Sequence, residues 1–176
     1  MNDDGALDEY FAVVARVDQA VATATATADD ALRCSRGCDS CCAPGLSVLP
    51  VEAERIARFL DERDVDAGVR DDRCVFLDRG GGCQIYEARP VLCRTHGLAL
   101  RTRQAPGRGL RILEDVSFCE LNYTRRSPTP AETLDADRIW ALVVTVDRRF
   151  RQRVGLPDDD QRIELAALVT PQPKAT

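Results

Sequence analysis

Eight cysteines give this sequence its chemistry, and four of them fall within nine residues. Their spacing is Cys34-x3-Cys38-x2-Cys41-Cys42. Two cysteines separated by two residues can turn both sulfurs toward one ion, because a tight turn brings their side chains together; zinc knuckles and iron–sulfur loops use this spacing. The loop from Cys34 to Gly45 also contains glycine and proline, which indicate an irregular loop rather than a core element. The cluster therefore predicts a metal site.

The adjacent pair Cys41 and Cys42 complicates a single site. Consecutive side chains point to different sides of the backbone, so the pair either serves two sites or has one thiol that binds metal and one that packs. The other cysteines are Cys74, Cys83, Cys93 and Cys119. Eight thiolates divide as four plus four, enough for two tetrahedral centres. All eight are candidate ligands, but Cys119 follows Cys93 by 26 residues and has the alternative of being a small buried apolar side chain.

The remaining composition indicates reduced thiols rather than disulfides. The chain begins Met1-Asn2-Asp3-Asp4, whereas a secretory signal begins with bases followed by an apolar run. No stretch approaches the roughly 18 to 20 apolar residues of a membrane span. Cysteine content is also below the roughly 8–10% that is typical of small disulfide scaffolds. We therefore expect a soluble, cytoplasmic protein with no membrane partner, whose thiols are kept reduced.

Charged residues surround the second group of cysteines. Glu87, Arg89 and Arg94 lie close to Cys93 in the sequence. One interpretation is a salt bridge that fixes the loop before Pro90. The other is that the arginines donate to thiolates and tune the affinity or reduction potential of a metal centre. His96, the only histidine, either ligates zinc, titrates near neutrality or is a hydrogen-bonded structural residue.

The overall charge argues against several function classes. Asp and Glu total 29 and Lys and Arg total 24, for a net charge of −5. Arginines gather locally, at Arg101, Arg103, Arg108, Arg111, Arg125, Arg126, Arg148, Arg149, Arg151 and Arg153. We interpret them as solvated faces paired with the surplus acids, because aromatic interleaving is absent and the total charge opposes a nucleic-acid partner. The sequence contains no Gly-rich phosphate loop, nucleophile elbow or His-Glu-x-x-His motif, which removes support for a conventional hydrolase.

Helices are expected at both ends of the chain. Apolar residues at Leu7, Phe11, Val14, Val17 and Val21 mark one helical face. The alternating Ala-Thr run that follows fits a strand by period, but alanine favours helix, so we extend this helix to about Asp30. A second helix begins at Pro50. A long third helix begins at Thr129-Pro130-Ala131-Glu132, which has the form of a capping box, and ends near Gly155.

The middle of the chain has a different character. Residues 74–77 and 83–86 flank Gly80-Gly81-Gly82 and predict a short hairpin. Residues 98–100 and 110–113 predict a second one. A short helix is expected over 160–168, before a polar tail at 169–176. The predicted fold is α+β, mainly helical: a single domain over 1–176 in which a cysteine-rich metal-binding core with short β-hairpins (31–120) is flanked by long terminal helices (1–30 and 129–168).

A resemblance to a known family follows from these motifs. The order is Cys34-x3-Cys38-x2-Cys41-Cys42, then Cys74-Val75-Phe76-Leu77, then Cys83-Gln84-Ile85-Tyr86 with Arg89-Pro90 and Cys93-Arg94 behind it. It resembles the YkgJ-like cysteine-cluster family of zinc- or iron-chelating domains over about residues 30 to 120. The resemblance implies a small metal-binding domain, described in that family as an iron–sulfur or zinc protein. The first three cysteines also have the spacing of radical S-adenosylmethionine enzymes, but no repeating βα pattern follows.

These observations lead to one expected function and two alternatives. We expect a metal-cluster protein with an iron–sulfur cofactor, of the 4Fe–4S type and with up to two centres, that transfers electrons or assists another enzyme. Its partner would be a redox or client protein, and it could be a component of an oxidoreductase. The alternatives are a zinc-stabilised interaction module and a metal-dependent protein-modifying enzyme. Eight cysteines and a single histidine favour iron, although both metals accept four cysteines.

Overall fold

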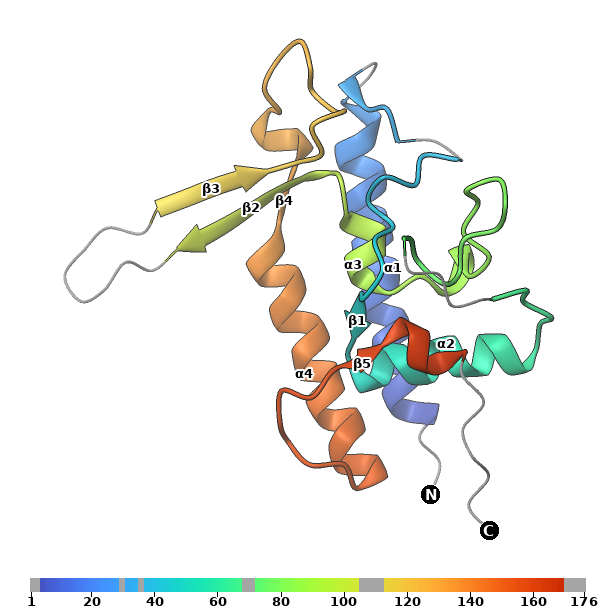
Figure 1. Cartoon of the computed structure of the whole chain (residues 1–176). Helices are drawn as coiled ribbons and strands as arrows, with labels where there is room; N and C mark the ends of the chain where they lie inside the picture. Colours follow the sequence, from blue (N-terminus) through green and yellow to red (C-terminus); the bar gives the residue numbers. More distant parts are fainter. Residues whose placement is uncertain (1–3, 29–30, 35–36, 68–71, 105–112, 170–176) are drawn as a thin grey trace.

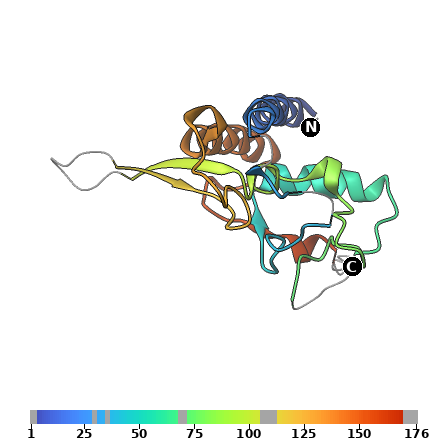
Figure 2. The same ribbon diagram turned by 90° about the horizontal axis from the view of Figure 1, so that it is seen from above.

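Two long helices form the structural framework of the molecule. The computed structural model describes residues 4–28, 31–34, 37–67, 72–104 and 113–169. Helix α1 (Asp4–Ala26) and helix α4 (Ala136–Val154) lie side by side and run antiparallel (Figures 1 and 2). The predicted N-terminal helix is thus confirmed, and its Ala-Thr run stays helical to Ala26. The hydroxyl of Thr25 donates to the carbonyl of Val21 at 2.9 Å, which keeps this polar side chain satisfied within the helix.

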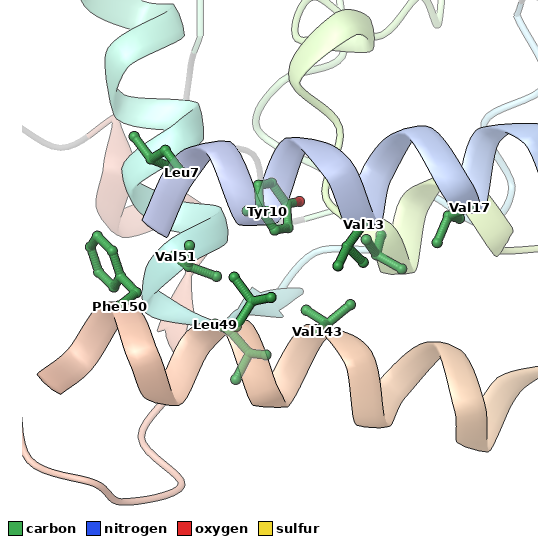
Figure 3. Close-up of a cluster of buried hydrophobic side chains, with 10 residues drawn as sticks. Leu7, Tyr10, Val13, Val17, Leu49, Val51, Val143 and Phe150 are labelled. Atoms are coloured by element: carbon green, nitrogen blue, oxygen red, sulfur yellow. The ribbon is translucent and has the colours of Figure 1, made fainter. Parts of the chain in front are cut away.

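The first hydrophobic core lies between these helices and the start of α2 (Pro50–Asp61). Its α1 residues recur every three or four positions, so they share one face of the helix. Figure 3 shows these side chains meeting those of α4. The buried members are Leu7, Tyr10, Val13, Val17, Leu49, Val51, Val91, Val143, Val146 and Phe150. No cysteine is among its buried members, although Val91, two residues before Cys93, belongs to it.

Helix α4 begins later than the sequence indicates. The capping box forms, with the backbone N–H of Thr129 donating to the Glu132 carboxylate at 2.6 Å, but it opens only the 3₁₀ turn η3 (Pro130–Glu132). The chain then forms β4 (Thr133–Asp135), which pairs in parallel with β2 (Ala99–Gln104). Asp135 is the true N-cap, since its side chain accepts from the backbone N–H of Arg138 at 3.0 Å. Prediction of the helix start at Thr129 was therefore wrong, because pairing with β2 holds these three residues extended.

Helix α2 (Pro50–Asp61) begins where Pro50 predicts. Two carboxylates hold its N-terminus: Glu52 accepts from the backbone N–H of Leu49 at 3.1 Å, and Asp147 of α4 accepts from that of Val51 at 3.0 Å. A second buried cluster joins this helix to the cysteine loops. It contains Val48, Ala53, Ile56, Phe59, Val75, Phe76, Ile85, Ala88 and Leu165, and the partly buried Cys74 and Cys83 pack against it.

Two small sheets complete the fold. Strand β2 (Ala99–Gln104) pairs antiparallel with β3 (Leu113–Ser117), which confirms the second predicted hairpin. The returning strand begins at Leu113 rather than at residue 110, and residues 110–112 lie outside the described residues. The first predicted hairpin is reduced to one bridge between Leu77 and Cys83. The helix predicted over 160–168 was wrong: β5 (Ile163–Glu164) pairs with β1 (Ser47–Val48), and only the 3₁₀ turn η4 (Leu165–Leu168) follows.

The architecture is α+β and mainly helical, as the sequence predicts. The interpretation of the arginines as partners of acids is confirmed at several positions: Arg101 and Arg103 pair with Asp135 at 3.3 and 3.2 Å, and Arg149 and Arg153 pair with Glu9 at 2.6 and 3.0 Å. Arg108 and Arg111 lie outside the described residues. None of the described helices combines the length and apolar character needed to cross a bilayer.

Candidate metal centre

Most of the cysteines share one cavity. The cavity has a volume of about 510 Å³ and lies between the cysteine loops, α3 (Val91–Thr95) and η4. The seven cysteines that line it are Cys34, Cys38, Cys41, Cys42, Cys74, Cys83 and Cys93. Apolar side chains such as Phe76 and Leu165 form part of its wall. Cys119 is not among the lining residues.

Backbone contacts bring the first two cysteine segments together. The N–H of Cys42 donates to the carbonyl of Asp39 at 2.8 Å, which closes a turn. The carbonyl of Cys42 accepts from the N–H of Cys74 at 2.8 Å. Gly81 lies at a φ of 78°, and a Cβ there would stand 3.2 Å from the Asp39 carboxylate and 3.3 Å from the carbonyl of Gly37. The glycine turn is therefore required for this close approach, because a larger residue would push the two loops apart.

Cys93 enters the cavity from a helix that the sequence did not indicate. Its helix, α3, is only five residues long. The first N–H of that helix, on Val91, donates to the buried Glu52 carboxylate at 2.9 Å, and the hydroxyl of Tyr10 donates to the same carboxylate at 3.4 Å. Burial raises the pKa of Glu52 above its usual value, against the lowering effect of the backbone N–H donors. Glu52 thus fixes the helix carrying Cys93 to α1 and α2.

Cys119 lies beside Cys34, with Gly97 between them. Gly97 has a φ of 86°. A Cβ added there would stand 3.4 Å from the Cys34 sulfur and 3.5 Å from the Cys119 Cβ. The backbone N–H of Cys119 donates to the carbonyl of Gly97 at 3.2 Å. The fold therefore brings Cys119 next to Cys34, although 85 residues separate the two along the chain.

Asn122 organises this region and was missed in the sequence. Its side chain is only 1% exposed. The amide nitrogen donates to the carbonyl of Gly97 at 2.7 Å and to the Cys34 sulfur at 3.3 Å, and the amide oxygen accepts from the N–H of Arg33 at 2.8 Å. An amide N–H directed at sulfur stabilises a thiolate. A single asparagine in a loop carries no sequence pattern that would have identified it.

The thiols are hard to ionise in this environment. Burial raises the pKa of Cys42 to about 12, and the neighbouring charges of Cys41, Cys74 and Cys83 add to the rise. Burial also raises the pKa of Cys93 to about 12, with further contributions from Cys74, Cys83 and Cys42. The pKa values of Cys41, Cys74 and Cys83 are raised, again chiefly by burial. Binding of a metal to such thiols must release protons, so its affinity falls as the pH falls.

The donor set fits a thiophilic metal, but its geometry is open. Within the described ranges, no three His, Cys, Asp or Glu side chains are already placed to hold one ion. The sulfurs line a shared chamber rather than a finished coordination sphere. Several soft sulfur donors are the ligands that zinc, copper(I) and iron–sulfur clusters prefer.

The two arginines near Cys93 have separate roles. Arg94 contacts both oxygens of Asp18 on α1 at 2.8 and 2.9 Å, and also donates to the carbonyls of Glu87 and Arg89 at 2.7 and 2.8 Å. It fixes the loop before Pro90, as one of the two interpretations predicts, but its carboxylate partner is not Glu87. Arg89 instead lines the cavity, with its guanidinium 3.5 Å from the centre of the Tyr86 ring.

Two further groups near the cavity were singled out in the sequence. His96 lines the cavity and is exposed. Glu87 pairs with Arg63 at 2.9 Å, and both side chains are more than half exposed. This ion pair is a surface contact and adds little to stability.

Comparison with known families is consistent with a metal site. A family model named CxxCxxCC, described as "Putative zinc- or iron-chelating domain", matches residues 33–126. This range includes all eight cysteines and Asn122. The chain has no match among curated proteins and none among solved structures.

Proposed function

The chain belongs to the CxxCxxCC family of zinc- or iron-chelating domains, and from this premise we propose that it is an iron–sulfur protein that transfers electrons or assists another enzyme. Metal binding is the property that the family supports. The choice of iron and the role in electron transfer are our proposal. They rest on the chemistry and size of the cavity and on the surface that surrounds it.

The cavity is the observation that carries this proposal. Seven cysteines line a chamber of about 510 Å³, a volume in the range of pockets that hold small molecules and cofactors, roughly 300 to 1,000 Å³. A structural zinc ion is enclosed directly by four ligands at about 2.0–2.3 Å and needs no chamber. A polynuclear cluster, which is larger and takes thiolate ligands from several segments, fits this site better.

The rim of the cavity suits a brief encounter with another protein. Tyr86 is 61% exposed and Leu92 38% exposed, and both also line the cavity. A partner docked on these side chains would lie close to the thiols. Redox partners commonly use small interfaces, below about 1,200 Å². A bound cluster would supply one-electron chemistry, while the chain's own residues hold it, limit its exposure to water and present it to the partner.

Anaerobic purification followed by elemental analysis tests the proposal. We expect a brown protein that contains iron and acid-labile sulfide, and a reversible one-electron signal in a reductive titration. A colourless protein with stoichiometric zinc would overturn the iron assignment and support the zinc-stabilised module. Iron and sulfide without any reversible redox signal would overturn electron transfer alone.

A further inference from the structure

We propose that the eight cysteines form two adjacent metal centres: an inner centre held by Cys42, Cys74, Cys83 and Cys93, and an outer centre held by Cys34, Cys38, Cys41 and Cys119. The proposal rests on the proposed function only in requiring that the chain binds metal, and it applies equally to iron and to zinc. It assigns Cys119 as a full ligand, although this cysteine lies outside the cavity lining.

The inner set is defined by backbone contacts between its segments. The N–H of Cys74 donates to the carbonyl of Cys42. The carbonyl of Cys74 in turn accepts from the N–H of Leu77 at 3.2 Å, and Leu77 forms a β-bridge with Cys83. Cys74 and Cys83 both pack against the second hydrophobic cluster, beneath α2. Cys93 enters the cavity lined by these three cysteines from α3.

The outer set gathers around Gly97. The Cys34 sulfur and the Cys119 Cβ both lie within 3.5 Å of the position that a Cβ on Gly97 would occupy. The buried side chain of Asn122 joins them, because its amide donates to the Cys34 sulfur at 3.3 Å while its backbone N–H donates to the carbonyl of Cys119 at 2.9 Å. Cys38 and Cys41 line the same cavity as Cys34 and follow it at a spacing that lets a tight loop turn its sulfurs toward one centre.

The boundary between the two sets passes between Cys41 and Cys42. The backbone carbonyl of Cys42 accepts from the N–H of Cys74 at 2.8 Å, whereas Cys41 completes the Cys34-x3-Cys38-x2-Cys41 spacing of the first cluster. Because consecutive side chains diverge from the backbone, each of the two is directed to its own group. Each group then supplies four sulfurs, the number that one tetrahedral zinc or one 4Fe–4S cluster requires.

Metal content per chain in alanine variants tests this division. Alanine is preferred to serine, because a serine oxygen can still ligate. We expect Cys93→Ala and Cys119→Ala each to lose about half of the metal of the wild-type protein. A double variant within the outer set, Cys34→Ala with Cys119→Ala, should also lose about half. A double variant across the sets, Cys93→Ala with Cys119→Ala, should lose nearly all of it.

Matched controls separate ligand loss from general damage. Thr95→Ala removes a buried hydroxyl two residues from Cys93, and Leu121→Ala trims an exposed side chain two residues from Cys119. Both should keep the full metal content, and circular dichroism should show that the helices persist in every variant. Full metal content in Cys119→Ala, or total loss in both single variants, would overturn the division while leaving metal binding intact. A wild-type protein without metal would overturn the proposed function, and the division with it.

Discussion

At the scale of single residues, the structure distinguishes Arg89 from Arg94, two arginines near Cys93 in the sequence, because only Arg89 lines the cavity. Arg94 is neutralised by Asp18, with N–O distances of 2.8 and 2.9 Å, and it lies outside the cavity lining. Arg89 lines the cavity and has no carboxylate partner among the described residues. Its charge already lowers the pKa of Cys83, although burial raises that pKa overall. Of the two, only Arg89 presents net positive charge to the thiols.

This difference predicts an unequal effect on reduction potential. A positive charge near the sulfurs stabilises the reduced, more negative state of a cluster. Arg89→Gln should therefore lower the potential by tens of millivolts, where about 59 mV corresponds to a tenfold change for one electron. Arg94→Gln should change it little and should instead weaken the attachment of the 86–90 loop to α1. Reductive titration of both variants measures the shift, and an equal or larger shift in Arg94→Gln would contradict this account.

At the scale of elements, an ion pair between the partly exposed Arg126 and the buried Glu132 fixes the segment that follows Cys119 and Asn122. Arg126 donates to the Glu132 carboxylate at 2.8 Å and to the carbonyl of Ala28 at 3.2 Å. Glu132 is 2% exposed, and the hydrogen bond from Arg126 is the main cause that lowers its pKa to about 2. This contact connects the end of α1, the loop after Cys119 and the turn η3, so it helps to hold the outer cysteines in place.

The lowered pKa of Glu132 sets the sign of a pH effect. A carboxyl with a folded-state pKa below its unfolded value stabilises the protein above the unfolded pKa, and this contribution is lost as the pH falls toward the folded value. At pH 7, Glu132→Gln should lower the free energy of unfolding by about 1.5–3 kcal/mol. The difference from the wild-type protein should shrink between pH 4.5 and about 2.

Urea unfolding of the two proteins over this pH range measures that difference. Glu54→Gln is the matched control, because Glu54 pairs with Arg58 at 2.8 Å but both side chains are about one third exposed. It should cost at most about 0.5 kcal/mol. A difference for Glu132→Gln that stays constant with pH would show that the carboxylate charge is not what stabilises this joint.

At the scale of the whole molecule, the two hydrophobic clusters depend differently on metal. The α1–α4 core contains no cysteine, whereas Cys74 and Cys83 pack at the edge of the second cluster. The cysteine segments have few regular elements, and ordering their backbone costs about 1–2 kcal/mol per residue. Ligand bonds can offset this cost, so metal binding and ordering of the loops should be coupled.

Complete metal removal should therefore act locally. We expect amide hydrogen exchange to accelerate across residues 34–93 after chelation, while α1 and α4 keep most of their protection. The core residues of these two helices serve as the internal reference in the same experiment. Unchanged exchange across residues 34–93 would show that the loops are ordered by the protein alone.

The sequence by itself determined the features that depend on neighbours along the chain. Spacing of three or four residues predicted the helix α1, although its buried face includes Tyr10 and Val13 and leaves Phe11 exposed. Pro50 predicted the start of α2, and the motif at 34–42 predicted the metal binding that the family supports. Each of these properties involves residues within one or two turns of one another, so local backbone geometry is sufficient to produce them.

Tertiary structure alone decided which distant residues meet. Asn122 contacts Cys34 across 88 residues, and Thr133–Asp135 became a strand because β2 pairs with it. The proximity of Cys119 to Cys34 and the different surroundings of Arg89 and Arg94 have the same origin. Such contacts depend on how helices and loops pack, and packing is set by burial and hydrogen bonding summed over the whole chain. For that reason no local pattern in the sequence specified them.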